Sequence, residues 1–320
     1  MANAGRDVHT PVMLSADIAV EAGCELAESP VWDADRRRLL WVDILAGDVH
    51  AVDPACGARS RFSAGVPVGA VGLTTGDLTT GGGLVLAVVD GFAVCGPDGE
   101  NLTRLPGLRT NASAVRFNDG KPDPWGGFCA GTMRWRGKSE PGCLYRLSPD
   151  GEVSELLSGV GISNGLDWTD DRRTFYYVDS PSGGVDCFTV DPDTGALSGR
   201  RRFADIPAAE GVADGLTIDA DGGVWVAIFG GGELRRYTPD GRLDRVVRLP
   251  VSQVTSAAFG GPDLGVLYIT TARENFTPAD LRSEPHAGDI FCCEPGVTGR
   301  LPYRYSGRGT SATESLPDPA

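Results

Sequence analysis

The chain has 320 residues, and its 29 basic and 43 acidic side chains give a net charge of −14 at neutral pH. Hydrophobic residues make up 41% of the sequence, which is enough for a substantial core and excludes global disorder. The negative field disfavours nucleic acid as a partner and is compatible with attraction of a cation, although solubility alone also accounts for an acidic surface.

The N-terminal sequence and the cysteines indicate in which cellular compartment the protein is expected. The first 20 residues lack the apolar core of a signal peptide, and no apolar run is long enough to span a membrane. Eight cysteines without any C-x-x-C pair indicate reduced thiols. We therefore expect a cytoplasmic protein without a membrane partner. Residues 1–14 and 306–320 are polar and rich in small residues, which predicts disordered tails around a single domain at 15–305.

Between these tails the chain is a series of short apolar runs in pairs, separated by turn residues such as Gly-Asp and Asp-Gly. Such runs are typical of β-hairpins. The last pair is interrupted by an insertion rich in charge and proline. The pairs are 39–44 with 49–52, 84–89 with 92–95, 128–133 with 143–147, 175–179 with 185–190, 224–228 with 233–237, and 266–271 with 289–293.

A polar or small residue precedes each pair at a comparable place, and successive ones lie 41 to 50 residues apart. They are Glu28, Gly69, Asn118, Asn164, Asp214 and Ser256. Self-similarity at this period, with about four strands per unit, predicts an all-β fold, a six-bladed β-propeller. A sandwich would have fewer strands, and a parallel α/β sheet would need crossover helices. We expect a strand near 16–21 to join the C-terminal strands and close the last blade.

The stretch 116–133 reads RFNDGKPDPWGGFCAGTM and carries the densest polar group in the chain. Asn118-Asp119-Gly120 is turn chemistry, and 128–133 has the size of a buried strand. Polar groups in a loop that leads into a rigid strand are typical of a functional site. A solvated hairpin loop is the alternative for this stretch alone.

The contexts of Glu28, Asn164 and Asp214 (AESP, SNGLDW and ADGLTID) are similar in sequence and equivalent in the repeat. Innermost strands of a propeller converge on one axis, so the three side chains are expected to meet there. Two carboxylates and one carboxamide oxygen form a hard-oxygen site for a divalent cation. A single N-G or D-G pair is more often simply a turn.

From about residue 24 to 305 the chain resembles the senescence marker protein (regucalcin)/gluconolactonase family of six-bladed propellers. The resemblance rests on ESPVWD…LLWVDI, RFNDGKPDPWGGFCAGTM, ISNGLDWTDD…FYYVDS, ADGLTIDADGGVWVA, AFGGPDLGVLYIT and AGDIFCCEPGVTG. It implies that Glu28, Asn164 and Asp214 bind the catalytic metal, and that Arg116 and Asn118 contact substrate. It also implies hydrolysis of sugar lactones with one divalent cation, calcium first, with zinc, manganese or iron as alternatives.

Two features depart from the family pattern. The chain has Arg134-Trp135-Arg136 where the family often has an acidic residue after Gly-Thr-Met, and Gly127 where an Arg is common. Trp135 between two guanidinium groups is therefore a candidate for binding an anionic or planar substrate. The alternative is a surface strand with arginines that extend into solvent.

These observations predict a metal-dependent lactonase in which the cation polarises the lactone carbonyl and Asp214 is the catalytic residue that activates water. Arg116 and Asn118 would donate hydrogen bonds to the substrate. We expect a small-molecule substrate and a monomer or weak homo-oligomer. The alternatives are other chemistry on the same scaffold (phosphotriester hydrolysis or a ring-forming condensation) and a non-catalytic calcium-binding protein.

Gly161-Ile-Ser-Asn-Gly165 matches the G-x-S-x-G nucleophile elbow, so a serine mechanism through Ser163 is an alternative to metal catalysis. An elbow needs a helix after the serine and a partner histidine. No amphipathic helix is predicted after this motif, and His286 is the only downstream histidine. The metal mechanism is therefore preferred.

Overall fold

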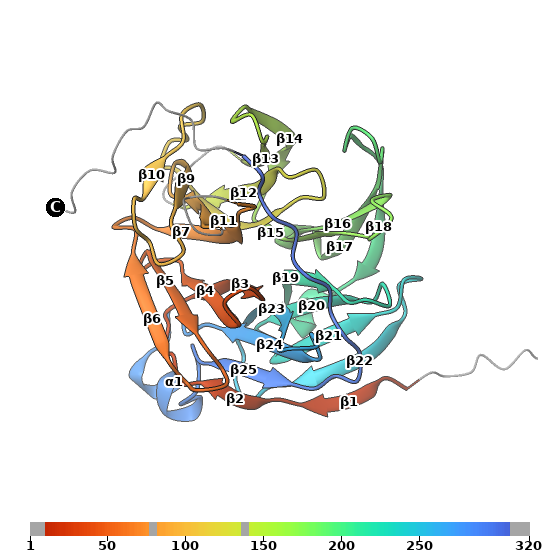
Figure 1. The fold of residues 1–320 in the computed structure, drawn as a ribbon. Helices are drawn as coiled ribbons and strands as arrows, with labels where there is room; N and C mark the ends of the chain where they lie inside the picture. Colours follow the sequence, from red (N-terminus) through yellow and green to blue (C-terminus); the bar gives the residue numbers. More distant parts are fainter. Residues whose placement is uncertain (1–9, 77–81, 136–140, 308–320) are drawn as a thin grey trace, which may run out of the picture.

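A computed structural model of the protein describes residues 10–76, 82–135 and 141–307. Figure 1 shows six small sheets arranged as blades around one axis, and the sheet topology confirms the predicted all-β six-bladed propeller. Within each blade the neighbouring strands from Ala27 onward are antiparallel to one another, and their order follows the chain from the axis outward.

The first three blades each contain four strands in sequence order. Blade 1 comprises β3 (Ala27–Asp33), β4 (Arg38–Asp43), β5 (Asp48–Val52) and β6 (Arg59–Ser63). Blade 2 comprises β7 (Val68–Leu73), β8 (Leu84–Val88), β9 (Gly91–Cys95) and β10 (Thr103–Arg104). Blade 3 comprises β11 (Val115–Pro122), β12 (Phe128–Arg134), β13 (Gly142–Leu147) and β14 (Val153–Val160).

The last two blades also take in the N-terminal strands. Blade 4 comprises β15 (Ser163–Trp168), β16 (Thr174–Asp179), β17 (Gly184–Val190) and β18 (Leu197–Asp205). Blade 5 comprises β19 (Val212–Ile218), β20 (Val224–Phe229), β21 (Glu233–Tyr237), β22 (Leu243–Arg248) and β1 (Val12–Ser15). Blade 6 comprises β23 (Val254–Gly260), β24 (Val266–Thr271), β25 (Ile290–Cys293) and β2 (Asp17–Val20).

The N-terminal strands behave as predicted in one respect and differently in another. β2 pairs with β25 and closes the last blade, as expected. β1 adds a parallel fifth strand beside β22, so regular structure begins at Val12 rather than at residue 15. The reason is that the outer edge of blade 5 supplies backbone partners, and short edge strands of this kind carry little sequence signal. Residues 1–9 and 308–320 of the two predicted tails lie outside the described residues.

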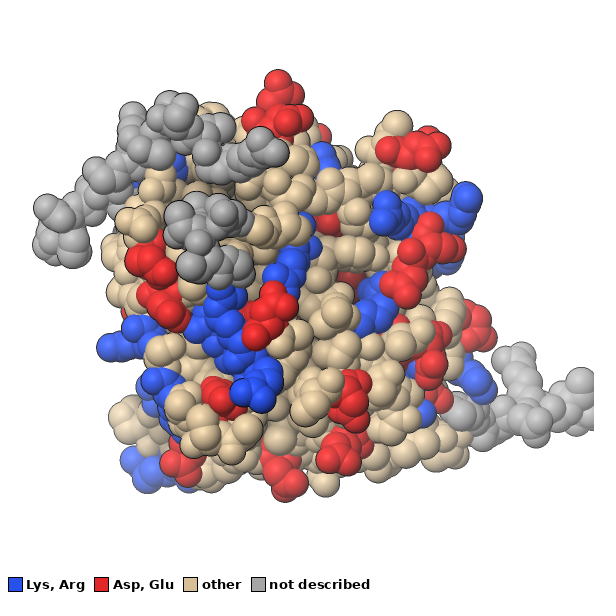
Figure 2. All heavy atoms as spheres, viewed as in Figure 1, with Lys and Arg blue, Asp and Glu red and all other residues tan. Residues whose placement is uncertain are grey.

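Each blade packs on the next through its own apolar layer. The inner strands of the blades, such as β8 with the sequence LVLAV, the second strand from the axis, are buried on both faces, which explains their continuous apolar runs. Among the described residues, six hydrophobic clusters each join a neighbouring pair of blades, including blades 6 and 1. The core is therefore a ring of interfaces between blades around the axis. Acidic and basic side chains are interspersed on the face of the molecule that Figure 2 shows.

Every innermost strand has a register irregularity beside the polar residue that marks the repeat. The pairing shifts between Glu28 and Val31, Val68 and Ala70, Phe117 and Asp119, Ser163 and Leu166, Ala213 and Leu216, and Val254 and Ser256. The interpretation of Asn118-Asp119-Gly120 as a turn was therefore wrong, because these residues lie inside β11. A β-bulge gives the same local signal of Asn, Asp and Gly while redirecting a side chain toward the axis.

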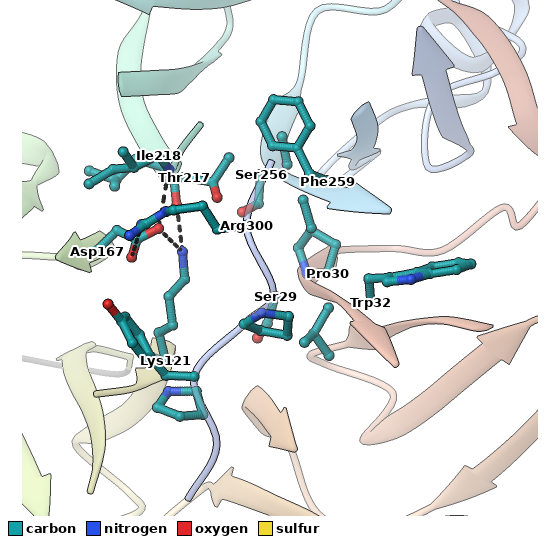
Figure 3. Close-up of a pocket in the computed structure, with 18 of the residues that line it drawn as sticks. Ser29, Pro30, Trp32, Lys121, Asp167, Thr217, Ile218, Ser256, Phe259 and Arg300 are labelled. Carbon is teal, nitrogen blue, oxygen red and sulfur yellow. Dashed lines mark hydrogen bonds and ion pairs between the residues drawn. The ribbon is translucent and has the colours of Figure 1, made fainter. Parts of the chain in front are cut away.

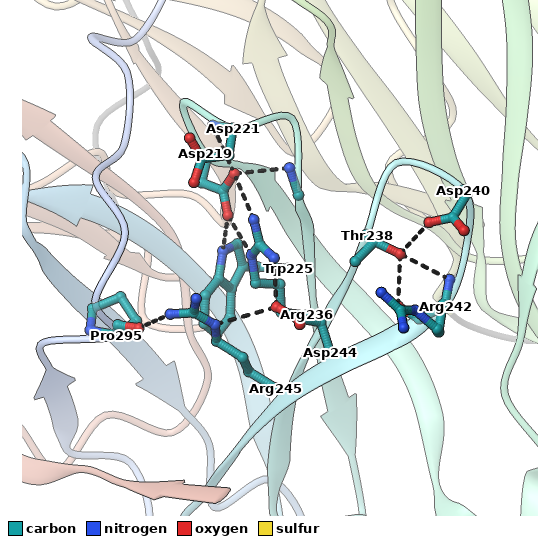
Figure 4. Close-up of polar contacts among 11 residues, drawn as sticks. Asp219, Asp221, Trp225, Arg236, Thr238, Asp240, Arg242, Asp244, Arg245 and Pro295 are labelled. Carbon is teal, nitrogen blue, oxygen red and sulfur yellow. Dashed lines mark hydrogen bonds and ion pairs between the residues drawn. The ribbon is translucent and has the colours of Figure 1, made fainter. Parts of the chain in front are cut away.

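Buried carboxylates fix the turns that connect the first and second strands of a blade. In blade 5, Oδ1 of Asp219 accepts from the backbone N–H of Gly223 at 2.8 Å. Its Oδ2 accepts from Trp225 Nε1 at 2.8 Å and from Arg236 Nε at 2.6 Å. Figure 4 shows this network with Asp244 on the far side of Arg236. Asp123 has the same arrangement with Arg146 in blade 3, so the turn geometry is part of the repeat.

The predicted insertion between β24 and β25 contains the helix α1 (Pro278–Ser283). Thr277 caps it: its side chain accepts from Asp280 N, and the Asp280 carboxylate accepts from the Thr277 backbone. Two short 3-10 turns, η1 (Ser180–Ser182) and η2 (Ala208–Glu210), complete the helical structure of the described residues. None of the described helices is both long and apolar enough to traverse a lipid bilayer.

Candidate active site

The bulges on β3, β15 and β19 bring Glu28, Asn164 and Asp214 together at one end of the central channel. Their exposed fractions are 2%, 4% and 7%. All three line one cavity of about 280 Å³, together with Arg116 and Asn118 from β11. The five residues selected from the sequence thus share a site, although they come from the innermost strands β3, β11, β15 and β19 of four different blades.

Glycines allow these strands to approach closely enough. A Cβ on Gly165 would lie 2.3 Å from the backbone N of Leu216, and one on Gly215 would lie 2.2 Å from Ser256 Oγ. Neither glycine has a positive φ. The N-G and D-G pairs of the repeat therefore serve contact between blades rather than turns, which places Asn164 beside Asp214.

A chain of hydrogen bonds connects the polar side chains across three blades, 3, 4 and 5. Arg116 Nη1 donates to Asn118 Oδ1 at 2.7 Å. Asn118 Nδ2 donates to Asn164 Oδ1 at 3.1 Å and to the backbone O of Ser163 at 2.9 Å. Asn164 Nδ2 donates to Ser180 Oγ at 2.8 Å, and Ser180 Oγ donates to the carbonyl of Ala213 at 2.7 Å. Both amide groups are thus held in fixed orientations.

Arg116 is the group in this network with capacity left for a ligand. It is 4% exposed, and its Nη1 also donates to Phe117 O at 3.0 Å. Its buried Nε–H has no hydrogen-bond partner within the described ranges. Burial lowers the pKa of Arg116 to about 10, against the opposing effect of Glu274, Glu28 and Asp214. A buried donor without a partner is costly, which favours a ligand oxygen at this position.

Burial raises the pKa of Glu28 well above its ordinary value, and the nearby charges of Asp214 and Asp119 add to that rise. Burial likewise raises the pKa of Asp214, with a further contribution from Asp119. The pKa of Asp119 rises to about 6 for the same reason, partly offset by Lys121. Three carboxylates therefore repel one another in a desolvated site.

This charge imbalance is what a divalent cation would relieve. In the part of the chain that the structure describes, Glu28, Asp119 and Asp214 form no salt bridge with a basic side chain. Uncompensated buried carboxylates are strongly unfavourable, whereas carboxylate and amide oxygens are the ligands that hard cations prefer. No three His, Cys, Asp or Glu side chains among the described residues form a group that could hold a metal. A cation here would therefore rest on the mixed set of Glu28, Asp214 and the Asn164 carboxamide.

The Arg134-Trp135-Arg136 segment is only partly covered by the described residues. Arg136 lies outside them, and Arg134 is exposed at the end of β12. Trp135 is half-buried, and its backbone N–H donates to Ala114 O at 2.9 Å. The residue is absent from the lining of the cavity. Met133, just before this segment, does line the cavity. A role of Trp135 in substrate binding stays a prediction.

Sequence reasoning missed several residues of the site. Ser180 bridges Asn164 to blade 5 from η1, and the sequence Asp-Ser-Pro there gives no sign of that role. Phe229 and Glu274 also line the cavity, from the ends of β20 and β24. Glu274 lies in the insertion, outside the repeat. A search for polar residues one blade-length apart therefore passes over it.

The other end of the channel is closed by the C-terminal segment. There a cavity of about 60 Å³ lies beneath residues 300–303, which cross the channel in Figure 3. Lys121 Nζ contacts Asp167 Oδ2 at 3.0 Å, and Arg300 Nη2 contacts Asp167 Oδ1 at 3.4 Å. Lys121 and Arg300 thus neutralise Asp167 at this end, where Asp119 also lines the cavity.

The nucleophile-elbow alternative is not supported by the geometry. Ser163 is fully buried within β15, and its Oγ accepts a hydrogen bond from Tyr177 OH at 2.8 Å. The residues after it continue a strand rather than a helix. A serine nucleophile needs an exposed hydroxyl and a base within reach, and Ser163 has neither in the described structure.

Known proteins resemble this chain over most of its length. Residues 26–273 match the family described as the SMP-30/gluconolactonase/LRE-like region, which is most of the chain and contains every candidate ligand. The chain belongs to this family. Its regucalcin relative from Oryctolagus cuniculus is 36% identical over 301 residues, covering 92% of this chain and 99% of that protein.

Two further members of the family span the same length. The putative sugar lactone lactonase YvrE of Bacillus subtilis (strain 168) is 32% identical over 295 residues, which cover 92% of this chain and 99% of the relative. The crystal structure of a calcium-binding protein, regucalcin, from Agrobacterium tumefaciens str. C58 superposes with a TM-score of 0.85 at 26% identity. It covers 93% of this chain and 99% of its own. The propeller is thus shared over its whole length.

Proposed function

We propose that this protein is a divalent-metal-dependent hydrolase of small-molecule lactones, with calcium as the first candidate cation. The proposal rests on one observation: Glu28, Asn164 and Asp214 lie on equivalent bulges and share a cavity with the unpartnered Nε–H of Arg116. Membership of a family that includes a protein named as a putative sugar lactone lactonase supports the substrate class.

In this proposal Glu28, Asn164 and Asp214 hold the cation, which when bound supplies a Lewis acid for the lactone carbonyl. Arg116 donates its Nε–H to the same carbonyl oxygen and stabilises the negative charge that develops there. Asn118 uses both Nδ2 hydrogens on Ser163 O and Asn164 Oδ1. It therefore positions Arg116 and Asn164 instead of donating to substrate, which differs from its expected role.

Asp214 is proposed to orient a water molecule and accept its proton as the water oxygen attacks the carbonyl carbon. The bond from that carbon to the ring oxygen then breaks, and the proton is returned to the ring oxygen as it leaves. The product is a hydroxy acid. Burial keeps Asp214 basic, while a bound cation lowers its pKa, so the two effects act in opposite directions on its strength as a base.

The test is hydrolysis of a lactone panel with and without chelator, followed with a pH indicator. Asp214→Asn is expected to abolish turnover. Glu28→Gln is expected to weaken cation affinity, measured by titration calorimetry, because the site loses one negative charge. Turnover that survives exhaustive chelation and Asp214→Asn would refute the metal mechanism.

A second candidate is cation binding without catalysis, which is favoured by the solved relative from Agrobacterium tumefaciens that is described as a calcium-binding protein. The same two assays separate the candidates. Cation binding that depends on Glu28 and Asp214, without hydrolysis of any lactone, would select this second function. The unpartnered donor of Arg116 argues for the first, because a pure cation site has no use for a buried cationic side chain next to it.

A further inference from the structure

A second cavity adjoins the candidate active site, and two residues line both cavities. It has a volume of about 460 Å³, larger than the 280 Å³ of the first. Phe229 and Glu274 line both, so the two cavities adjoin at these side chains. We call the larger cavity the annex. A small lactone at Arg116 and Asp214 would leave the annex free for a substituent on the same molecule.

The position of Glu274 at the shared wall is fixed through its backbone. The side-chain amide of Gln253 spans it: Gln253 Oε1 accepts from Glu274 N at 2.8 Å, and Gln253 Nε2 donates to Glu274 O at 3.0 Å. Gln253 is itself held by a bridge to Phe229 at the end of β20. The side chain of Glu274, in contrast, receives no hydrogen bond within the described ranges. A clamped backbone with an unused carboxylate is the arrangement expected of a ligand-binding group.

The annex carries two further carboxylates without basic partners among the described residues, Asp280 from α1 and Glu284 just after it. One oxygen of each is used structurally: Asp280 Oδ2 accepts from Thr277 N, and Glu284 Oε2 accepts from Ser252 N at 2.7 Å. Their second oxygens remain available. The charge of Glu274 acts on Arg116 in the adjoining cavity, so the annex's own excess negative charge is that of Asp280 and Glu284.

The occupant that fits these charges is an organic cation rather than a metal ion. The acidic side chains of the annex are not grouped closely enough to chelate, since no three such residues in the described chain can hold a metal. Two phenyl side chains, Phe229 and Phe276, also line the annex. Aromatic rings together with carboxylates are the surroundings that bind ammonium groups. The buried, unpartnered Nε–H of Arg116 lies in the adjoining cavity, where the lactone ring of the same molecule would be bound.

We infer that the substrate of this site is a lactone bearing a positively charged substituent, and that the annex binds this substituent through Glu274, Phe229 and Phe276. This inference rests on the proposed lactonase function and specifies its substrate class. It reverses the sign of charge expected from Arg134 and Arg136. The described charges next to the cavity are those of the annex, whereas Arg134 is exposed and outside the lining.

The test uses two lactones that differ only in charge: one carries a trimethylammonium-alkyl arm and the other its neutral tert-butyl isostere. Neither arm can attack the lactone ring, and the charge does not depend on pH. We expect kcat/KM to be about tenfold or more higher for the cationic lactone, as cation–π and Coulomb contacts predict. Glu274→Gln should remove most of this ratio. Glu294→Gln, the same change at an exposed site after β25, should leave it intact.

Binding measurements separate failure of this inference from failure of the proposed function. If neither lactone is hydrolysed, the matching cyclic ethers, which cannot be hydrolysed, are titrated by calorimetry instead. Tighter binding of the cationic ether that is lost in Glu274→Gln, and in Glu284→Gln as a second variant, supports the annex even without catalysis. Equal affinities of the two ethers, or a charge preference that both variants keep, would overturn the inference.

Discussion

Gly165→Ala tests whether close packing of blades 4 and 5 is what assembles the site. The new Cβ would lie 2.3 Å from the backbone N of Leu216, about 1.1 Å short of the 3.4 Å at which ordinary contact begins. Backbone atoms of an inner strand cannot turn aside, so β15 and β19 must separate by about this distance. Overpacking of this kind costs about 1–3 kcal/mol of stability. A shift of about 1 Å in a catalytic group lowers activity by up to about a hundredfold.

Two measurements follow from this displacement, because Asn164 precedes Gly165 and Asp214 lies two residues before Leu216. Urea unfolding in the presence of chelator should show the loss of about 1–3 kcal/mol, and titration calorimetry should show weaker cation binding. Gly265→Ala is the matched control, because its Cβ would meet only the flexible carboxylate of Asp263 at 3.2 Å. If Gly165→Ala matches this control in both stability and cation affinity, contact between the blades is not what positions the ligands.

Three other outcomes are expected. Asp219→Asn should lower the free energy of unfolding in urea by about 1.5–3 kcal/mol, because the buried guanidinium of Arg236 loses one charged partner and keeps Asp244; a change near zero would contradict this. Burial raises the pKa of Cys24 to about 12, so at pH 8 it stays a protonated thiol, and mass spectrometry should find iodoacetamide on exposed Cys56 but not on Cys24 until the protein unfolds. Labelling of Cys24 in the folded protein would mean that this end of blade 6 opens. Ser163→Ala should keep kcat/KM for lactones within about threefold, because the Ser163 hydroxyl is buried and used as an acceptor; a complete loss with cation binding intact would restore the serine mechanism.

The repeat made the fold predictable, because each blade encodes the same hairpin and turn signals. Glu28, Asn164 and Asp214 could be brought together from the sequence for the same reason: equivalent positions in a ring meet at its axis. What the sequence could not distinguish was a turn from a bulge at Asn118, since both use Asn, Asp and Gly.

Residues that act outside the repeat were not predictable. Ser180 and Glu274 reach the site from connections rather than from innermost strands, so no spacing identifies them. β1 was missed because its partner is the outer edge of β22, and its four positions, three exposed and one half-buried, give no alternating pattern. The candidate cation ligands could thus be predicted from the repeat. Ser180 and Glu274 could not, because their positions at the site depend on tertiary contacts.

The pairing of β2 with β25 has a consequence for synthesis of the protein on the ribosome. The contact between Ala22 and Asp289 that secures this junction joins residues 267 positions apart. At about 5–20 residues per second, the first strands wait for roughly 15–60 seconds before the last ones emerge. During that time the nascent chain is an open arc, with the free faces of blades 1 and 5 exposed to association. Chaperone occupancy is therefore expected to be highest just before residue 290 leaves the exit tunnel.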